Sequence, residues 1–234
     1  MAGIVREGDE DWEFITGRAV AEEVFRTNAG DGVVYVYRIE PDEYHSDADF
    51  TAFYIAVYNV NGYLEPIWGF GETPKEALEN AEMKWGEEEI RRMNLENRTS
   101  GYFNPFSKAL EKFKKYEKED EDEYMTGMVA GMLDVEGVLR ADVGDGAVYV
   151  YRIDNFTDHD KLPLVNFYIA TLYASNGAGG MEKVWGFGKT PKEALEYAEM
   201  NWDNLTGGYA NPFRKALEML KENEENNDNI LQNY

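Results

Sequence analysis

The sequence contains GDGVVYVYRI at residues 30–39 and the nearly identical GDGAVYVYRI at residues 144–153. Further matches follow at similar spacing: WGFG at 68–71 and 185–188, TPKEAL at 73–78 and 190–195, and NPF at 104–106 and 211–213. The chain is therefore an internal duplication. Any structural argument made on one copy can be checked on the other.

The duplication divides the 234 residues into two units, each of a usual domain size. We predict a first repeat at residues 1–118 and a second repeat at residues 119–234. The charged run at 114–123 is the expected boundary, and an acidic, asparagine-rich tail from about residue 222 is expected to be frayed.

Strand patterns dominate the first part of each unit. Residues 33–39 alternate β-branched and aromatic side chains, and residues 52–60 and 66–70 read as two further strands. Asn61-Gly62 favours a tight turn between the last two. Before these strands, residues 11–25 space their apolar side chains as a helix does.

Two helices follow the strands. Thr73, Pro74 and Glu76 form a capping box, and TPKE at 190–193 repeats it. A last helix begins at Asn104-Pro105 and again at residues 211–212. The predicted fold class is α+β: a tandem duplication of a unit with a three-stranded antiparallel sheet packed against helices, in the order α-β-β-β-α-α.

The composition restricts the classes of function. Forty-six acidic residues against 23 basic ones leave a net charge of −23. Such a field repels phosphates and disfavours direct nucleic-acid binding, whereas a basic protein partner suits it. The absence of cysteine excludes disulfides and thiolate metal sites. No apolar run is long enough for a membrane span, and the first residues lack the layout of a signal peptide, so we expect a cytoplasmic protein.

The two histidines, His45 and His159, occupy equivalent positions in acid-rich loops. Histidine with carboxylates can bind a divalent metal or act in acid–base chemistry. The flanking acids do not align between the copies, which favours solvent-facing loop histidines. Because no nucleophile motif is present either, we expect neither an enzyme nor a cofactor.

Aromatic residues crowd the predicted strands. Alternation along a strand directs some of them away from the helices, where tyrosines beside carboxylates suit a protein interface. The alternative is that they fill the repeat cores and the contact between repeats. The candidate contact residues are Tyr37, Tyr58, Tyr63, Tyr151, Tyr173, Glu87, Glu88 and Glu89.

The stretch GFGETPKEALENAE at residues 69–82, which follows three strands, resembles the HicB-type antitoxin unit. The resemblance covers about residues 33–85 and 147–202. It implies strands leading into a helix, and a non-enzymatic protein that covers a basic toxin ribonuclease. The chain departs from that family in carrying two units, in its flanking helices and in showing no DNA-binding appendage.

These observations lead to one main hypothesis. The chain would be an acidic binding protein that occludes a basic, nucleic-acid-acting partner or mimics its nucleic acid, as an antitoxin or a virus- or plasmid-encoded inhibitor does. Two linked modules would raise the effective concentration of each contact. The alternatives are a small-ligand or metal-binding protein that uses His45 and His159, and a self-assembling structural protein.

Overall fold

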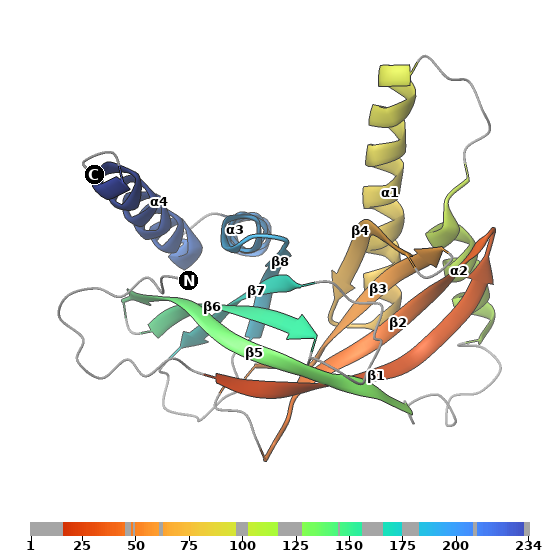
Figure 1. The fold of residues 1–234 in the computed structure, drawn as a ribbon, viewed down its shortest axis with the longest axis horizontal. Helices are drawn as coiled ribbons and strands as arrows, with labels where there is room; N and C mark the ends of the chain where they lie inside the picture. Colours follow the sequence, from red (N-terminus) through yellow and green to blue (C-terminus); the bar gives the residue numbers. More distant parts are fainter. Residues whose placement is uncertain are drawn as a thin grey trace.

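The computed structural model describes residues 16–44, 48, 50–60, 63–96, 103–116, 128–144, 146–155, 166–174, 183–207 and 210–231. Its strands are β1 (Thr16–Ala29), β2 (Gly32–Pro41), β3 (Phe53–Val60), β4 (Tyr63–Gly71), β5 (Met128–Val143), β6 (Gly146–Asn155), β7 (Phe167–Ala174) and β8 (Lys183–Gly188). Its helices are α1 (Pro74–Glu96), α2 (Pro105–Tyr116), α3 (Pro191–Thr206) and α4 (Pro212–Leu231) (Figure 1).

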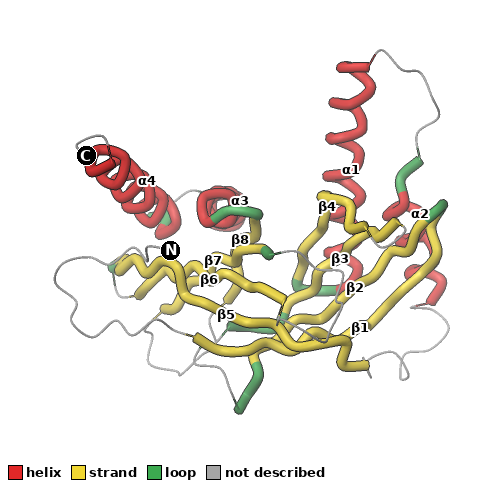
Figure 2. Tube along the Cα trace, in the orientation of Figure 1, coloured by secondary structure: helices red, strands yellow, loops and turns green. Residues whose placement is uncertain are grey.

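The eight strands form one antiparallel sheet in the order β4-β3-β2-β1-β5-β6-β7-β8 (Figure 2). At its centre β1 and β5, one from each half of the chain, pair with Ala19 opposite Leu133. The strand order outward from this pair is the same on both sides. The sheet curves so strongly that its edge strands approach one another, and Phe70 of β4 stacks on Phe187 of β8.

The predicted fold class is wrong in its first element and in its architecture. Residues 16–25, expected to lie in a helix, belong to the long strand β1. Each half thus contributes four strands and two helices. The two halves do not form separate three-stranded sheets but share one nearly closed sheet, because β1 and β5 bond to each other as well as to their own neighbours.

An irregularity in β1 lets this one strand contribute to two cores. Ala19 and Ala21 are buried in the central core, whereas Phe25 and Ala29 are buried against the helices of the first half. Between them the register with β2 shifts at Glu23/Phe25. A bulge of this kind moves the following side chains to the opposite face of the sheet, so the buried residues stay an even number of positions apart although the core that they face changes.

The same device recurs in β5. Leu133 and Val135 belong to the central core, and Leu139 and Ala141 to the core of the second half. The register with β6 shifts at Gly137/Leu139. Both bulged strands therefore pass from the shared core to the core of their own half.

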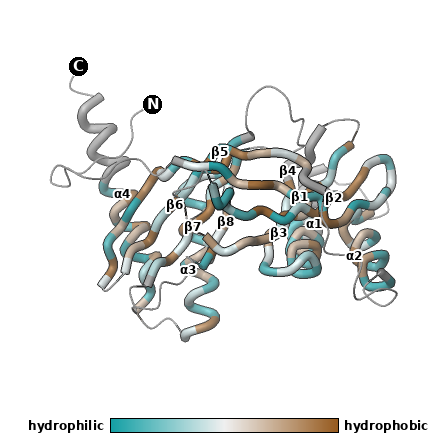
Figure 3. Tube along the Cα trace, turned by 90° about the horizontal axis from the view of Figure 1, so that it is seen from below, coloured by the Kyte–Doolittle hydropathy of each residue, from teal (hydrophilic) through white to brown (hydrophobic). Residues whose placement is uncertain are grey.

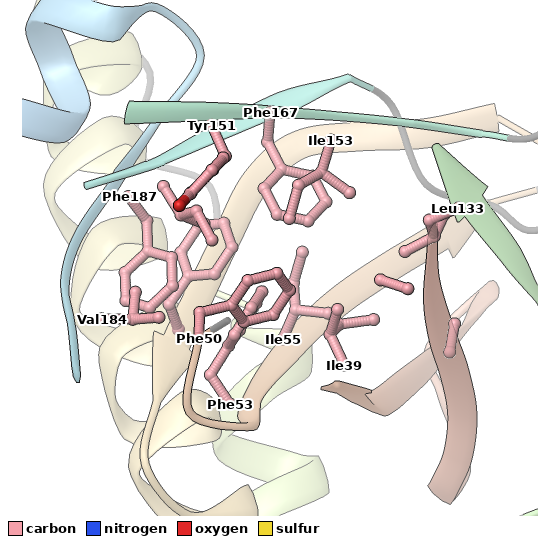
Figure 4. Close-up of a cluster of buried hydrophobic side chains, with 14 of the residues drawn as sticks. Ile39, Phe50, Phe53, Ile55, Leu133, Tyr151, Ile153, Phe167, Val184 and Phe187 are labelled. Carbon is pink, nitrogen blue, oxygen red and sulfur yellow. The ribbon is translucent and has the colours of Figure 1, made fainter. Parts of the chain in front are cut away.

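Three hydrophobic cores result. The central core lies between the two halves and contains aromatic rings from both, among them Phe50, Phe53, Tyr151, Phe167 and Phe187 (Figure 4). An outer core in each half packs the other face of the strands against α1 and α2, or against α3 and α4. Figure 3 shows hydrophobic positions along the strands of both halves, while the helices carry both kinds of residue.

The predicted capping boxes are confirmed. The Thr190 hydroxyl accepts a hydrogen bond from the Glu193 amide at 3.1 Å, and the Glu193 carboxylate accepts one from the Lys189 amide at 2.7 Å. Thr73 and Glu76 make the equivalent bonds at the start of α1. Local sequence thus determines where α1 and α3 begin.

Other expectations fall beyond the described residues or differ from the structure. The turn at Asn61-Gly62 and the predicted boundary between residues 118 and 119 lie outside the described residues. The segment from residue 222, expected to be frayed, continues helix α4 to Leu231.

Candidate functional site: a groove between the two halves

The two halves meet at the edge strands through a matched pair of rings. Phe70 and Phe187 hold the same position in the repeated WGFG motif, and their ring centroids lie 4.3 Å apart with the planes 3° from parallel. Hollows lie on both sides of this stack, and both draw residues from both halves. The stack is therefore the floor shared by two related sites.

Glycines in the same motif bring the helices close to the sheet edge. A Cβ atom at Gly69 would lie 2.0 Å from the Ala77 carbonyl oxygen, and one at Gly186 would lie 2.1 Å from that of Ala194. Only glycine permits such an approach. These glycines therefore have a packing role, which places α1 and α3 beside the ring stack.

The larger hollow, which we call the α1–α3 groove, has a volume of about 630 Å³. Its aromatic wall consists of Trp68, Phe70, Phe187 and Tyr197. Its charged residues are Lys84, Glu87 and Glu88 from α1, Lys189, and Glu193 and Glu196 from α3. Four carboxylates against two ammonium groups leave the groove with a negative balance.

Both lysines of the groove lie over aromatic rings. The Nζ atom of Lys84 is 5.0 Å from the centroid of Tyr197 and 5.6 Å from that of Phe70. The Nζ atom of Lys189 is 5.6 Å from the centroid of Trp68. These distances suit cation–π attraction, which acts within about 6 Å.

Burial sets the electrostatics of the groove. It lowers the pKa of the Lys84 ammonium, while the carboxylates of Glu193 and Glu87 act in the opposite direction. Burial also raises the pKa of the Tyr197 hydroxyl, and Glu76 adds to this effect. Among the described residues no carboxylate lies within ion-pair distance of Lys84, so its charge is held by rings and by more distant acids.

The smaller hollow, which we call the β8 pocket, has a volume of about 400 Å³. Here the Nζ atom of Lys183 lies 2.7 Å from a Glu72 carboxylate oxygen and 4.9 Å from the centroid of Trp185. Trp185 is the counterpart of Trp68 in the other copy. Each site therefore has a lysine ammonium group over the tryptophan of its WGFG motif. The two lysines, Lys189 and Lys183, come from different positions of the repeat.

Three substitutions between the copies make the two sites chemically different. Glu72, Asn80 and Lys84 of the first copy align, in that order, with Lys189, Tyr197 and Asn201 of the second. In the β8 pocket the amides of Asn80 and Asn201 donate to the Phe70 and Trp185 carbonyl oxygens. The groove therefore contains the partly buried ammonium group of Lys84 and the additional ring of Tyr197. The pocket contains side-chain amides that are hydrogen-bonded to the backbone.

Acidic residues outnumber basic ones in the sequences of both helices that border the groove. Helix α1 holds seven glutamates against four basic residues, and α3 holds four acids against one lysine. In each helix a methionine stands exposed at the same position, Met83 at 56% and Met200 at 51%. Met200 lines the groove. An exposed thioether among carboxylates, present in both copies, is not needed to fill either core.

The predicted contact residues separate into two groups. Tyr37 is 2% exposed, Tyr151 is in the central core, and Tyr58 is buried with its hydroxyl donating to the Ala29 carbonyl oxygen at 2.9 Å. Tyr37 and Tyr151 present almost no surface to a partner, because the face of the sheet that was expected to be open closes on the other half. Tyr58 is instead covered by α1 and α2, where its ring contacts Trp85 and Phe106. Tyr173 is 38% exposed.

Glu87 and Glu88 line the α1–α3 groove, and none of the predicted contact tyrosines is among the described residues that line it. The side chains of Tyr63 and Glu89 lie outside the described residues, as do His45 and His159. Within the part of the chain that the structure describes, no cluster of three or more histidine, aspartate or glutamate side chains is placed to hold a metal ion.

Sequence reasoning missed Lys84, Tyr197 and Met200. The signal for the first two was present in the differences between the copies rather than in the matches. Lys84 is aligned with Asn201, and Asn80 is aligned with Tyr197. The exposed methionines could have been found as apolar residues on the charged face of two otherwise amphipathic helices.

No protein-family model matches the chain, and no solved structure matches it. The resemblance to HicB-type antitoxins therefore stays a prediction. The chain is 46% identical over 55 residues to "Uncharacterized protein ORF77" of Acidianus filamentous virus 1 (isolate United States/Yellowstone). The match covers 24% of this chain and 65% of that viral protein, so it spans less than two thirds of the relative.

Among the described helices, none combines the length and the apolar character that a membrane span requires.

Proposed function

We propose that this chain is a non-enzymatic binding protein that docks a basic protein partner against the acidic surface of α1 and α3. The observation that carries the proposal is the pair of exposed methionines at equivalent positions of two helices that are rich in acidic residues. Methionine adapts its shape to different partners, and carboxylates attract and orient a basic surface.

This site replaces the tyrosine-bearing sheet face as the expected contact surface. The tyrosines stabilise the joint between the halves, while the helices keep their acids toward solvent: Glu79, Glu87 and Glu196 are exposed. The ion pairs of Glu79 with Lys75 and of Glu196 with Lys192 measure 3.9 and 3.8 Å. Such exposed pairs are weak, so both glutamates are able to turn to a partner.

The mechanism would be occlusion. A basic nucleic-acid-binding protein covered by this surface could not reach the phosphate backbone. The carboxylates would bind the cationic side chains of the partner that otherwise contact the phosphates. The similarity to a viral protein supports a virus-encoded inhibitor of a host protein as the setting. The net charge of −23 also predicts fast, salt-sensitive association.

The test begins with capture of host proteins on the immobilised chain at low salt, followed by elution with rising salt and identification. The decisive step uses the purified partner. The double variant Glu79→Gln with Glu196→Gln removes two charges at equivalent positions of α1 and α3. We expect it to weaken binding about tenfold, since each exposed charge contributes up to roughly 1 kcal/mol.

The matched control is Glu111→Gln with Glu218→Gln. It also removes two exposed charges at equivalent positions, but from α2 and α4. If both double variants lose the same affinity, only the total charge matters and α1–α3 is not the docking surface. The partner should also lose its nucleic acid when the chain is added. A ternary complex would contradict occlusion.

A further inference from the structure

The lysines of the α1–α3 groove show what kind of side chain its rings accept. Lys84 reaches the faces of two rings contributed by different halves, Phe70 and Tyr197. Lys189 reaches a third, Trp68. The chain itself thus places cationic groups against this wall.

The negative balance of the groove leaves it suited to further positive charge. Glu87 and Glu193 both act on Lys84, and Glu88 and Glu196 line the same hollow. Lys84 is partly desolvated there, and among the described residues it has no carboxylate in direct contact. A strongly hydrated ammonium is a poor occupant of such a place, whereas a guanidinium is more weakly hydrated and stacks on rings.

We propose that the α1–α3 groove is an arginine-binding site, and that Lys84 occupies it until an arginine side chain of the basic partner displaces it. The inference rests on the proposed function, since it names the side chain through which the basic partner is held. Lys84 then leaves for solvent, and the arginine takes its place between Tyr197 and Phe70 with Glu193 and Glu87 as its counter-charges.

The groove also predicts a difference from the β8 pocket. In that pocket Lys183 is held by a direct 2.7 Å contact with Glu72 as well as by Trp185, so displacing it breaks an ion pair. Displacement of Lys84 breaks no ion pair within the described part of the chain. Arginine should therefore enter the groove first.

The experiment uses the full chain and a short peptide of alternating arginine and glycine. Length-matched peptides with lysine or with neutral citrulline in place of arginine serve as probes of the head group. Lys84→Ala removes the present occupant, and Lys75→Ala removes the same charge from the exposed side of α1. Thermal unfolding followed by circular dichroism verifies that each variant is folded.

We expect Lys84→Ala to bind the arginine peptide about fivefold more tightly than Lys75→Ala does, because the rings and carboxylates no longer have an internal occupant. Arginine should bind more tightly than lysine, and citrulline should not bind. Adding Tyr197→Leu to Lys84→Ala should remove the gain. With methyl-labelled methionine, the Met200 signal should shift on binding while that of Met83 stays.

Equal affinities in the two alanine variants would overturn this inference and leave the proposed function standing, because the surface would then act through its charge alone. Weaker binding by Lys84→Ala would also overturn it, since Lys84 would be a contact rather than an occupant. If the arginine peptide binds no variant at any salt concentration, both the inference and the proposed function fail.

Discussion

The two halves of this chain share the rings and glycines that close the sheet, and they differ in chemistry beside the ring stack that joins them. Buried Phe53 and Phe167 are counterparts, as are Phe106 and Phe213, and Gly69 and Gly186 are equally crowded. The residues that line the groove and the pocket differ between the copies: Lys84 is aligned with Asn201, and Asn80 is aligned with Tyr197. Both copies retain these rings and glycines, whereas the hollows beside the ring stack have different chemistry.

The largest effect should come from the rings that join the halves. Phe53→Ala should lower the free energy of unfolding by about 3–5 kcal/mol. Because Phe53 contacts Phe167 and Phe187 of the second half, amide hydrogen exchange should accelerate in β6 and β7 as well as in β2 and β3. Phe106→Ala, within the outer core of the first half, is the control. Exchange changes confined to the first half in both variants would show that the halves unfold separately.

The next effect concerns the close approach of helix and strand. Gly69→Ala and Gly186→Ala should each destabilise the protein by about 1–3 kcal/mol, since the new methyl group overlaps a helix carbonyl. Urea unfolding of both variants checks whether the values agree. A large loss in one copy and none in the other would contradict the equivalence of the two scaffolds.

A smaller effect is expected at the helix caps. Thr73→Ala and Thr190→Ala should each lower stability by about 1 kcal/mol, because the amide of Glu76 or Glu193 loses its acceptor. Serine at either position retains the acceptor and should restore most of the loss. Thermal denaturation measures both, and failure of serine to rescue would mean that the methyl group of threonine matters instead.

The smallest effect distinguishes the two hollows by pH. Burial lowers the pKa of Lys84 in the folded state, so its charged form opposes folding below that pKa, and this penalty is lost as the pH rises through it. Lys84→Met should therefore gain stability relative to wild type at pH 7 and lose most of that gain by about pH 10.5. Urea unfolding at both pH values measures it.

Asn201→Met is the matched control at the equivalent position of α3. It removes no titrating group, so its effect on stability should be the same at both pH values. A Lys84→Met gain that does not change with pH would show that desolvation of the ammonium is not the cause.

Local patterns were predictable where neighbouring residues alone decide the structure. The strands at 33–39 and 52–60 and the caps at Thr73 and Thr190 depend on contacts within a few residues, and the structure contains them. Residues 16–25 were misread because β1 has apolar side chains on both faces: Ala19 and Ala21 are buried, and Val20 and Val24 at the intervening positions are partly buried. A strand shows a clear two-residue period only while one of its faces is polar.

The site was predictable only in part. Glu87 and Glu88 were chosen for their charge and do line the groove. Of the two roles that the sequence left open for Tyr37 and Tyr151, an exposed interface or the contact between the repeats, the structure has the second. Nothing local in the sequence shows that the second face of each half meets its counterpart. That meeting depends on the pairing of β1 with β5, whose partners lie more than 100 residues apart.

The sequence by itself determined that the chain is a duplication, that it is strongly acidic, and where strands β2 and β3 and helices α1 and α3 form. These properties depend on composition and on residues close together in the chain. Only the tertiary structure decided that the two copies share one sheet, and that Lys84 of one half lies against Tyr197 of the other. The physical reason is that apolar faces are buried by whichever surface completes the core, and here that surface is the other copy.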